Sequence, residues 1–171
     1  MTIRRMIPML TVTAALALGQ AATAQDAAGQ PAEPAAPEAA QEGGLTLADL
    51  GKDEALTAAV EKMAEGHQLP GWLREGAVVT PGQKVGFGGK EYLAMTACQQ
   101  HDCAENQMAV LYAPDGGAAY GVLSVRDGEG AELLTWLGMA GGPETIDGRT
   151  ILYAALTGSL ANHPEAFVYP E

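Results

Sequence analysis

The spacing of apolar residues along the chain changes twice and so divides it into three parts. Residues 6–18 form a continuous apolar run, and residues 25–44 contain no aromatic or β-branched residue. A segment of Ala, Pro, Glu, Gln and Gly buries too little apolar surface to offset its ordering entropy. We therefore expect a flexible tether at 25–44. From residue 45 apolar positions recur with structural periods, which predicts one folded domain at 45–171.

The first periodic segment predicts an amphipathic helix. Thr46 and Asp49 have the spacing of a capping box, and Asp53 can cap a second helix start, with a possible break at Gly51. Gly66 provides a stop signal. The positions that share one face of this helix are Leu56, Val60, Met63 and His67.

After Pro81 the period shortens to that of β-strands. The predicted strands lie at about 84–87, 91–97, 107–113, 119–125 and 132–137. Short connections rich in Gly, Asp and Pro separate them, which favours antiparallel neighbours.

A second helix is predicted from Asp147, as its cap, to near Gly158, with one face formed by Ile151, Leu152, Ala155 and Leu156. The fold class is therefore α+β: a central antiparallel sheet of about five strands, flanked by an N-terminal and a C-terminal helix.

The first 24 residues have the features of a secretory signal peptide. Arg4 and Arg5 precede the apolar run, and Ala22-Thr23-Ala24 is a small-residue cleavage site. A membrane-spanning helix needs about 20 apolar residues, and the chain has no such run. We therefore expect a periplasmic domain, exported by a cleaved signal peptide at 1–24, in a compartment where cysteines oxidise.

The only two cysteines lie in Cys98-Gln99-Gln100-His101-Asp102-Cys103. A disulfide between Cys98 and Cys103 would close a small ring around His101 at the tip of a hairpin, between the second and third predicted strands. In the chain-entropy model so short a loop contributes only about 2 kcal/mol of stability. The better reason for the ring is to display a side chain rigidly.

Other interpretations of this ring stay open at this point. The spacing differs from the Cys-x2-Cys of thiol oxidoreductases and lacks the Cys-x2-Cys-His of haem attachment. Zinc could be bound by Cys98, His101 and Cys103 with Asp102 or water, although six adjacent residues seldom surround a tetrahedral ion. A disulfide that only pins a turn is the simplest alternative.

Neither catalysis nor a cofactor is indicated elsewhere. Ser124 and Ser159 lack a Gly-x-Ser-x-Gly setting, and the sequence has no Gly-rich phosphate loop and no His-Glu-x-x-His pair. We therefore expect neither an enzyme nor a metal or cofactor site. His67 and His163 are interpreted as structural residues, and Trp72 and Trp136 as core anchors.

Charge narrows the class of partner. The chain has a formal net charge of −12, and residues 45–171 alone, with 17 acidic and seven basic residues, carry −10. Such a surface disfavours nucleic acid. It favours a cationic protein, because opposite net charges accelerate encounter.

A collinear series of motifs resembles the Ivy family, inhibitors of vertebrate (c-type) lysozyme. The series runs for 104 residues, from Gly66 to Tyr169. Besides the Cys-x-x-His-Asp-Cys ring it comprises Gly66-His67-Gln68-Leu69-Pro70, Thr80-Pro81, Leu134-Thr135-Trp136-Leu137, Ile146-Asp147-Gly148, the stretch 154–160 and Asn162-His163-Pro164.

The resemblance implies an exported inhibitor that inserts a rigid, disulfide-closed loop into the lysozyme cleft. The inhibitory loop would be Cys98, Gln99, Gln100, His101, Asp102 and Cys103, with His101 between the two catalytic carboxyl groups. The family loop usually has Lys-Pro where this chain has Gln99-Gln100. Partners implied are c-type lysozyme or another muramidase, and a homodimer is possible. The alternatives are a regulator of endogenous lytic transglycosylases and a non-inhibitory periplasmic interaction module.

Overall fold

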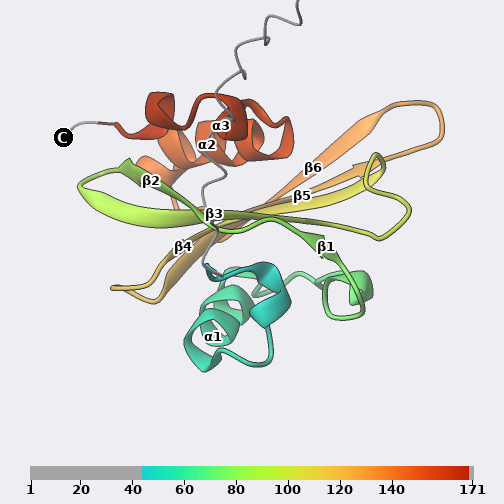
Figure 1. Ribbon diagram of the computed structural model, residues 1–171, viewed down its shortest axis with the longest axis horizontal. Helices are drawn as coiled ribbons and strands as arrows, with labels where there is room; N and C mark the ends of the chain where they lie inside the picture. Colours follow the sequence, from blue (N-terminus) through green and yellow to red (C-terminus); the bar gives the residue numbers. More distant parts are fainter. Residues whose placement is uncertain (1–43, 170–171) are drawn as a thin grey trace, which may run out of the picture. The chain divides into compact units, whose positions relative to one another are not determined.

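The computed structural model describes residues 44–169 as one antiparallel sheet between two helical layers (Figure 1). The predicted signal peptide and nearly all of the predicted tether lie outside the described residues, so these two predictions stay as they are. The sheet contains β1 (Val78–Val79), β2 (Gln83–Phe87), β3 (Lys90–Cys98), β4 (Asn106–Ala113), β5 (Ala118–Arg126) and β6 (Glu132–Leu137). The α+β prediction is confirmed.

The five predicted strands are present, and β1 is an additional short one. Strands β1 and β2 both pair with β3, and the sheet continues β3-β4-β5-β6, with every pairing antiparallel. With only two residues, β1 is too short to give an alternation signal in the sequence.

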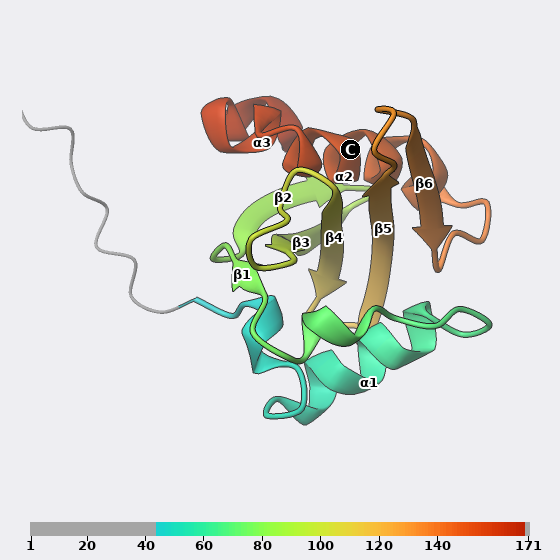
Figure 2. The ribbon, with the colours of Figure 1, turned by 90° about the vertical axis from the view of Figure 1, so that its right-hand side faces the viewer.

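Each face of the sheet is covered by helices (Figures 1 and 2). Helix α1 (Glu54–Met63) covers one face, where Leu56, Val60 and Met63 pack with buried residues of the strands. Helices α2 (Asp147–Leu156) and α3 (Ser159–Asn162) cover the other. Strand β4 is buried along most of its length because both layers cover it.

The start of the domain follows the predicted capping signals. Thr46 and Asp49 form a capping box on a 3-10 helix at Leu47–Asp49, and Asp53 Oδ1 accepts a hydrogen bond from Leu56 N at 2.8 Å. Gly51, with φ +84°, separates the two helices. The prediction was wrong for His67: α1 ends at Met63, and a turn places His67 outside the helix, exposed to solvent.

The predicted cap of the second helix was also wrong. Asp147 is the first residue of α2, and Ile146 occupies the cap position without a side-chain hydrogen bond. The preceding 3-10 helix at Pro143–Thr145 runs directly into α2, so no extended residue is left for a side-chain cap. The Asp147 carboxylate still lies in the first turn, where it complements the helix dipole.

A buried carboxylate fixes the turn between β6 and α2. Glu144 is 6% exposed, and its Oε1 accepts hydrogen bonds from the backbone N–H groups of Gly142 at 2.8 Å and Ala140 at 3.1 Å. Burial alone would raise the pKa of Glu144, but these N–H donors hold its pKa below the usual range. Glu144 is thus a structural anion, turned away from solvent.

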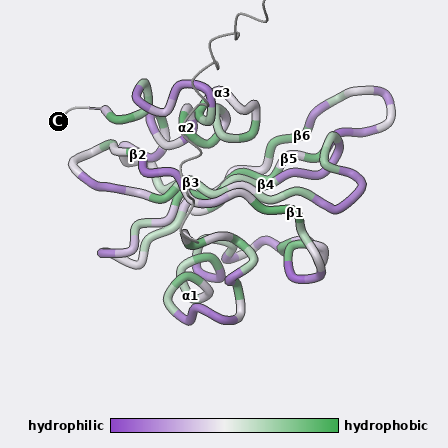
Figure 3. The backbone as a smooth tube through the Cα atoms, in the orientation of Figure 1, coloured by the Kyte–Doolittle hydropathy of each residue, from purple (hydrophilic) through white to green (hydrophobic). Residues whose placement is uncertain are grey.

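Polar residues gather in the turns at both ends of the sheet, whereas the middle of the strands is apolar (Figure 3). At one end β3 leads into β4 and β5 into β6; at the other lie the β2–β3 and β4–β5 turns. No helix within residues 44–169 has the length and apolar character needed to cross a membrane.

Candidate functional site

The candidate site is the connection between β3 and β4, residues 99–105, at one end of the sheet. Three connections meet there. Val78 pairs with Cys98, so the chain entering β1 lies beside the loop, and Asn106 pairs with Val125, so the β5–β6 turn lies on its other side. We call residues 98–103 the ring.

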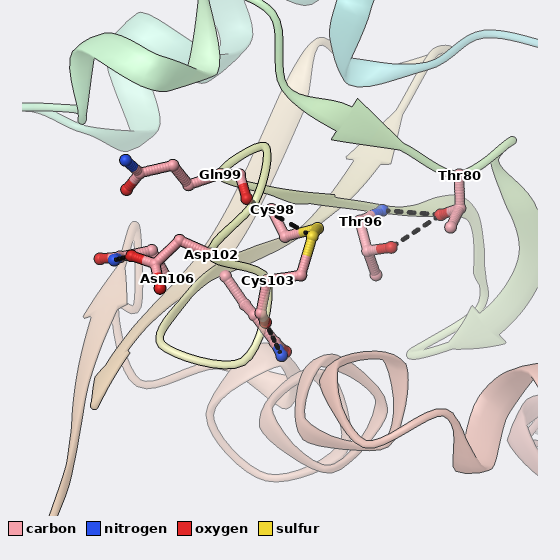
Figure 4. The surroundings of a disulfide bond; sticks show 8 residues. Thr80, Thr96, Cys98, Gln99, Asp102, Cys103 and Asn106 are labelled. Atoms are coloured by element: carbon pink, nitrogen blue, oxygen red, sulfur yellow. Dashed lines mark hydrogen bonds between the residues drawn. A yellow bond between two sulfur atoms is a disulfide. The ribbon is translucent and has the colours of Figure 1, made fainter. Parts of the chain in front are cut away.

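A disulfide closes the ring, as predicted. Cys98, the last residue of β3, is bonded to Cys103, and their Cα atoms are 4.8 Å apart (Figure 4). Sulfur atoms in a disulfide are not thiolates, which are the form that binds zinc or attacks a substrate. Within residues 44–169 no three His, Cys, Asp or Glu side chains are grouped to hold a metal ion.

His101 stands at the tip of a tight turn inside the ring. Asp102 N donates to Gln99 O at 2.9 Å, which makes Gln100 and His101 the two central residues of a β-turn. His101 has φ +68°, whereas Gln100 has no positive φ. A positive φ at the second central position and not at the first is the pattern of a type II turn. Both central residues are exposed.

Asp102 follows His101, and its polar groups are hydrogen-bonded to other residues of the loop and to the start of β4. Its carboxylate accepts a hydrogen bond from Asn106 Nδ2 at 2.7 Å (Figure 4). Its carbonyl oxygen accepts from the N–H groups of Glu105 and Asn106 at 3.1 and 3.0 Å. The turn at Gln99–Asp102 therefore continues directly into a second, hydrogen-bonded turn that leads into β4.

Further hydrogen bonds attach the loop to the sheet. Gln99 N donates to Asn106 O at 3.0 Å, and Arg126 N, at the end of β5, donates to Glu105 O at 2.8 Å. The Gln107 side chain donates to the carbonyl oxygen of Cys103. The base of the loop is thus held by β4 and β5, while Gln100 and His101 at its tip are exposed.

The structure brings the six predicted loop residues together in different environments. Gln100 and His101 are exposed, whereas Cys98, Gln99, Asp102 and Cys103 are half-buried. The other two histidines lie elsewhere: His67 follows α1, and His163 follows α3. Neither of them is part of the ring.

Sequence reasoning missed Asn106 and Gln107, whose side chains bond to ring residues. Both precede the buried part of β4, in positions that alternation alone assigns to a strand. The spacing of four residues from Asp102 to Asn106 was the available signal, because an acceptor and a donor at that distance can meet within one helical turn.

Acidic charge is concentrated around the ring. We define the ring end as residues 74–77, 99–105 and 126–132, which contain six acidic and two basic side chains. The two cations are paired: Arg74 with Glu61 at 3.2 Å and Arg126 with Glu132 at 3.3 Å. At the opposite end, residues 87–91, 113–118 and 138–142 contain two acidic side chains and one basic. The ring end is therefore the more anionic.

The sequence of this α+β domain is similar to those of known proteins. A sequence model of the family described as inhibitor of vertebrate lysozyme (Ivy) matches residues 55–146, more than half of the chain. The chain belongs to this family, which confirms the resemblance seen in the sequence.

Individual relatives agree with the family assignment. The protein of Escherichia coli K12 named inhibitor of vertebrate lysozyme is 37% identical over 163 residues, which cover 95% of this chain and 92% of that protein. A protein of the same name from Pseudomonas aeruginosa PAO1 is 28% identical over 67 residues, or 39% of this chain and 44% of the relative.

Proposed function

We propose that this chain is a periplasmic inhibitor of c-type lysozyme that blocks the catalytic cleft with His101. The observation that carries the proposal is His101 itself: an exposed side chain in a left-handed backbone conformation, at the tip of a disulfide-closed turn, in a member of the Ivy family. The E. coli relative, which aligns with nearly the whole chain, is named for the same activity.

The chemistry of the target explains why a histidine suits this position. A glycosidase such as lysozyme uses one carboxyl group as a proton donor and a second as a carboxylate, on opposite sides of the bond to be cleaved. An imidazole has two ring nitrogens that can hydrogen-bond in opposite directions. His101 placed between the two groups would occupy the position of the scissile bond and fix their protonation states.

The ring reduces the entropic cost of this insertion. A flexible loop loses conformational freedom when it enters a cleft, and that loss subtracts from the binding free energy. Here the disulfide, the type II turn and the bonds from β4 and β5 hold the tip in one conformation before binding. The interaction is therefore that of a preformed plug with a preformed cleft.

The proposed location follows from the predicted signal peptide at 1–24, the tether at 25–44 and the domain at 45–171. Export would place the ring where disulfides form and where an incoming lysozyme reaches the cell wall. N-terminal sequencing of the protein recovered from a periplasmic extract tests this directly. A mature chain that begins near Gln25 supports export, whereas a cytosolic protein that retains Met1 contradicts it.

The test of inhibition is a lysis assay with c-type lysozyme, the wild-type protein and His101→Ala. We expect the wild type to inhibit, and His101→Ala to raise the inhibition constant by about 100-fold, because buried central residues dominate binding at such interfaces. His67→Ala and His163→Ala are matched controls, since both replace exposed histidines away from the ring. An unchanged inhibition constant for folded His101→Ala would rule out the plug.

The same assay separates the alternative targets. A lytic transglycosylase has a single catalytic acid and would offer His101 one carboxyl partner instead of two. Gln99-Gln100, in place of the family's usual Lys-Pro, is the feature of this chain that makes a different target worth testing. Inhibition of a transglycosylase but not of lysozyme would change the assigned target, and inhibition of neither would favour a non-inhibitory interaction module.

A further inference from the structure

The ring sequence presents two adjacent polar side chains, His101 and Asp102, to which a partner could bind. The structure distinguishes them. His101 is exposed, whereas Asp102 is half-buried and its carboxylate bonds to Asn106 Nδ2 at 2.7 Å. One oxygen of this carboxylate is therefore already engaged by a residue of the same loop (Figure 4).

The backbone of Asp102 is used in the same manner. Its N–H closes the turn on Gln99 O at 2.9 Å, and its carbonyl oxygen receives the N–H groups of Glu105 and Asn106. Together with the side-chain bond, these contacts fix the residue that immediately follows His101. We call the contact between the Asp102 carboxylate and the Asn106 amide the clasp.

The clasp lies next to a residue in an unfavourable backbone conformation, His101. His101 has φ +68°, a region that residues with a Cβ atom seldom adopt and that persists only where surrounding contacts hold it. The disulfide restrains the two ends of the ring, at Cys98 and Cys103, but it does not by itself determine the φ angle of a residue between them. Asp102 is the neighbour whose contacts do so.

We propose that Asn106 is a positioning residue for His101 and that Asp102 acts through the clasp instead of contacting the target. Asn106 lies outside the ring, at the first position of β4, where pairing with Val125 fixes it to the sheet. The clasp therefore transmits the rigidity of the sheet to the ring tip. The proposal rests on the proposed function and assigns a role to a residue that the ring motif does not include.

Exchanging the two side chains tests the clasp. Asn106→Asp places two carboxylates against each other, and Asn106→Ala removes the donor without adding charge. The double variant D102N/N106D restores a bond between an amide and a carboxylate, with unchanged net charge. We expect each single substitution at Asn106 to raise the inhibition constant for c-type lysozyme about tenfold, and the exchange to return it to within about threefold of the wild type.

A second arm separates positioning from general stability. If Asn106 acts through His101, Asn106→Ala changes binding by less than about twofold when His101 is already Ala, as a double-mutant cycle reports. An equal loss in both backgrounds overturns the proposal. The proposal is also overturned if D102N/N106D is folded but inhibits as weakly as Asn106→Asp. That result would mean that the target contacts the Asp102 carboxylate directly.

Failure of the clasp can be told apart from failure of the proposed function. Hydrogen exchange of the Asp102 and Asn106 backbone amides, both hydrogen-bonded in the loop, needs no target enzyme. Faster hydrogen exchange of these amides in Asn106→Ala and Asn106→Asp, with the wild-type rate restored in D102N/N106D, supports the clasp. This holds even if the wild type fails to inhibit lysozyme. Unchanged hydrogen-exchange rates in every variant overturn the clasp proposal even if the wild type inhibits strongly.

Discussion

Two hairpin turns lie side by side at the ring end of the sheet. Each contains an Asp side chain that accepts a hydrogen bond within the turn and one residue with positive φ, but the residue with positive φ differs. In the β5–β6 turn, Asp127 Oδ1 accepts from the N–H groups of Glu129 at 3.0 Å and Ala131 at 2.9 Å, and Gly130 has φ +88°. In the ring, the Asp102 carboxylate likewise accepts a local hydrogen bond, from Asn106 Nδ2, but the residue with positive φ is His101.

The two turns differ in the residue that takes the left-handed backbone conformation. Every other residue with positive φ in the described part of the chain is a glycine, which adopts that conformation without steric cost. A histidine there costs about 1 kcal/mol in backbone strain. The ring is closed by a disulfide and contains the clasp, and we propose that both hold His101 in this conformation so that its side chain is presented to a target.

Reciprocal substitutions at the two positions give the largest expected effects. His101→Gly should leave the free energy of unfolding unchanged or raise it by up to about 1 kcal/mol, while inhibition weakens by about 100-fold. Gly130→Ala should lower the free energy of unfolding by about 1 kcal/mol with no change in inhibition. A Cβ atom at Gly130 would meet no other atom within 4 Å, so the cost is in the backbone alone.

Urea denaturation and lysozyme inhibition kinetics measure the two quantities separately. The comparison fails if Gly130→Ala impairs inhibition as strongly as His101→Gly, or if His101→Gly unfolds more easily than the wild type by more than 1 kcal/mol. The first result would mean that the β5–β6 turn takes part in inhibition, and the second that His101 is a structural residue.

Opening the ring is the next largest change. The double variant C98S/C103S should weaken inhibition by about tenfold, because the loop then loses more conformational freedom on binding. Stability should fall by only about 2 kcal/mol. The β5–β6 turn serves as the internal control, since its amide exchange should not change. If the loss of inhibition equalled the fraction of C98S/C103S that is unfolded, the disulfide would only stabilise the fold.

Restoring the proline typical of the family should have a smaller effect of opposite sign. Gln100 is the first central residue of a type II turn, where proline is favoured, and its N–H donates to no backbone acceptor among residues 44–169. Gln100→Pro should therefore tighten inhibition about two- to fivefold by restricting the free loop. Weaker inhibition by this variant would mean that the ring changes its turn type on binding.

The smallest effect concerns charge at the exposed end of the β5–β6 turn. Glu129→Gln removes a carboxylate from the ring end and should lower the association rate with a cationic lysozyme by up to about twofold at low salt. Asp115→Asn, in the β4–β5 turn at the opposite end, is the matched control and should change less. An association rate that is insensitive to added salt would remove the electrostatic contribution altogether.

The sequence was sufficient for the strands but not for the details of the ring. Alternation of apolar residues located five strands because their side chains repeat with a period of two, and the Cys98–Cys103 spacing placed a closed ring at a hairpin tip. The positive φ of His101 could not be predicted, since it depends on the hydrogen bond from Asp102 N to Gln99 O. The clasp was missed as well, because the four-residue spacing of Asp102 and Asn106 permits such a bond without requiring it.

The same limit explains the two errors at helix ends. His67 fits the spacing of the α1 face, but the turn after Met63 takes it off the helix. Asp147 has the chemistry of a cap, yet a 3-10 helix already supplies the helical backbone before it. Both errors concern the exact residue at which a helix ends or begins, and local sequence pattern does not fix helix boundaries to within one or two residues.

The most direct test of the account is a double-mutant cycle between His101 and the catalytic carboxyl groups of c-type lysozyme. Binding of wild-type protein and His101→Ala would be measured by calorimetry, first with intact lysozyme and then with a lysozyme whose catalytic Glu and Asp are both replaced by amides. If His101 lies between those groups, its replacement costs about 100-fold with intact lysozyme and no more than a few-fold with the amide variant. An equal loss with both lysozymes would place His101 somewhere other than the catalytic site.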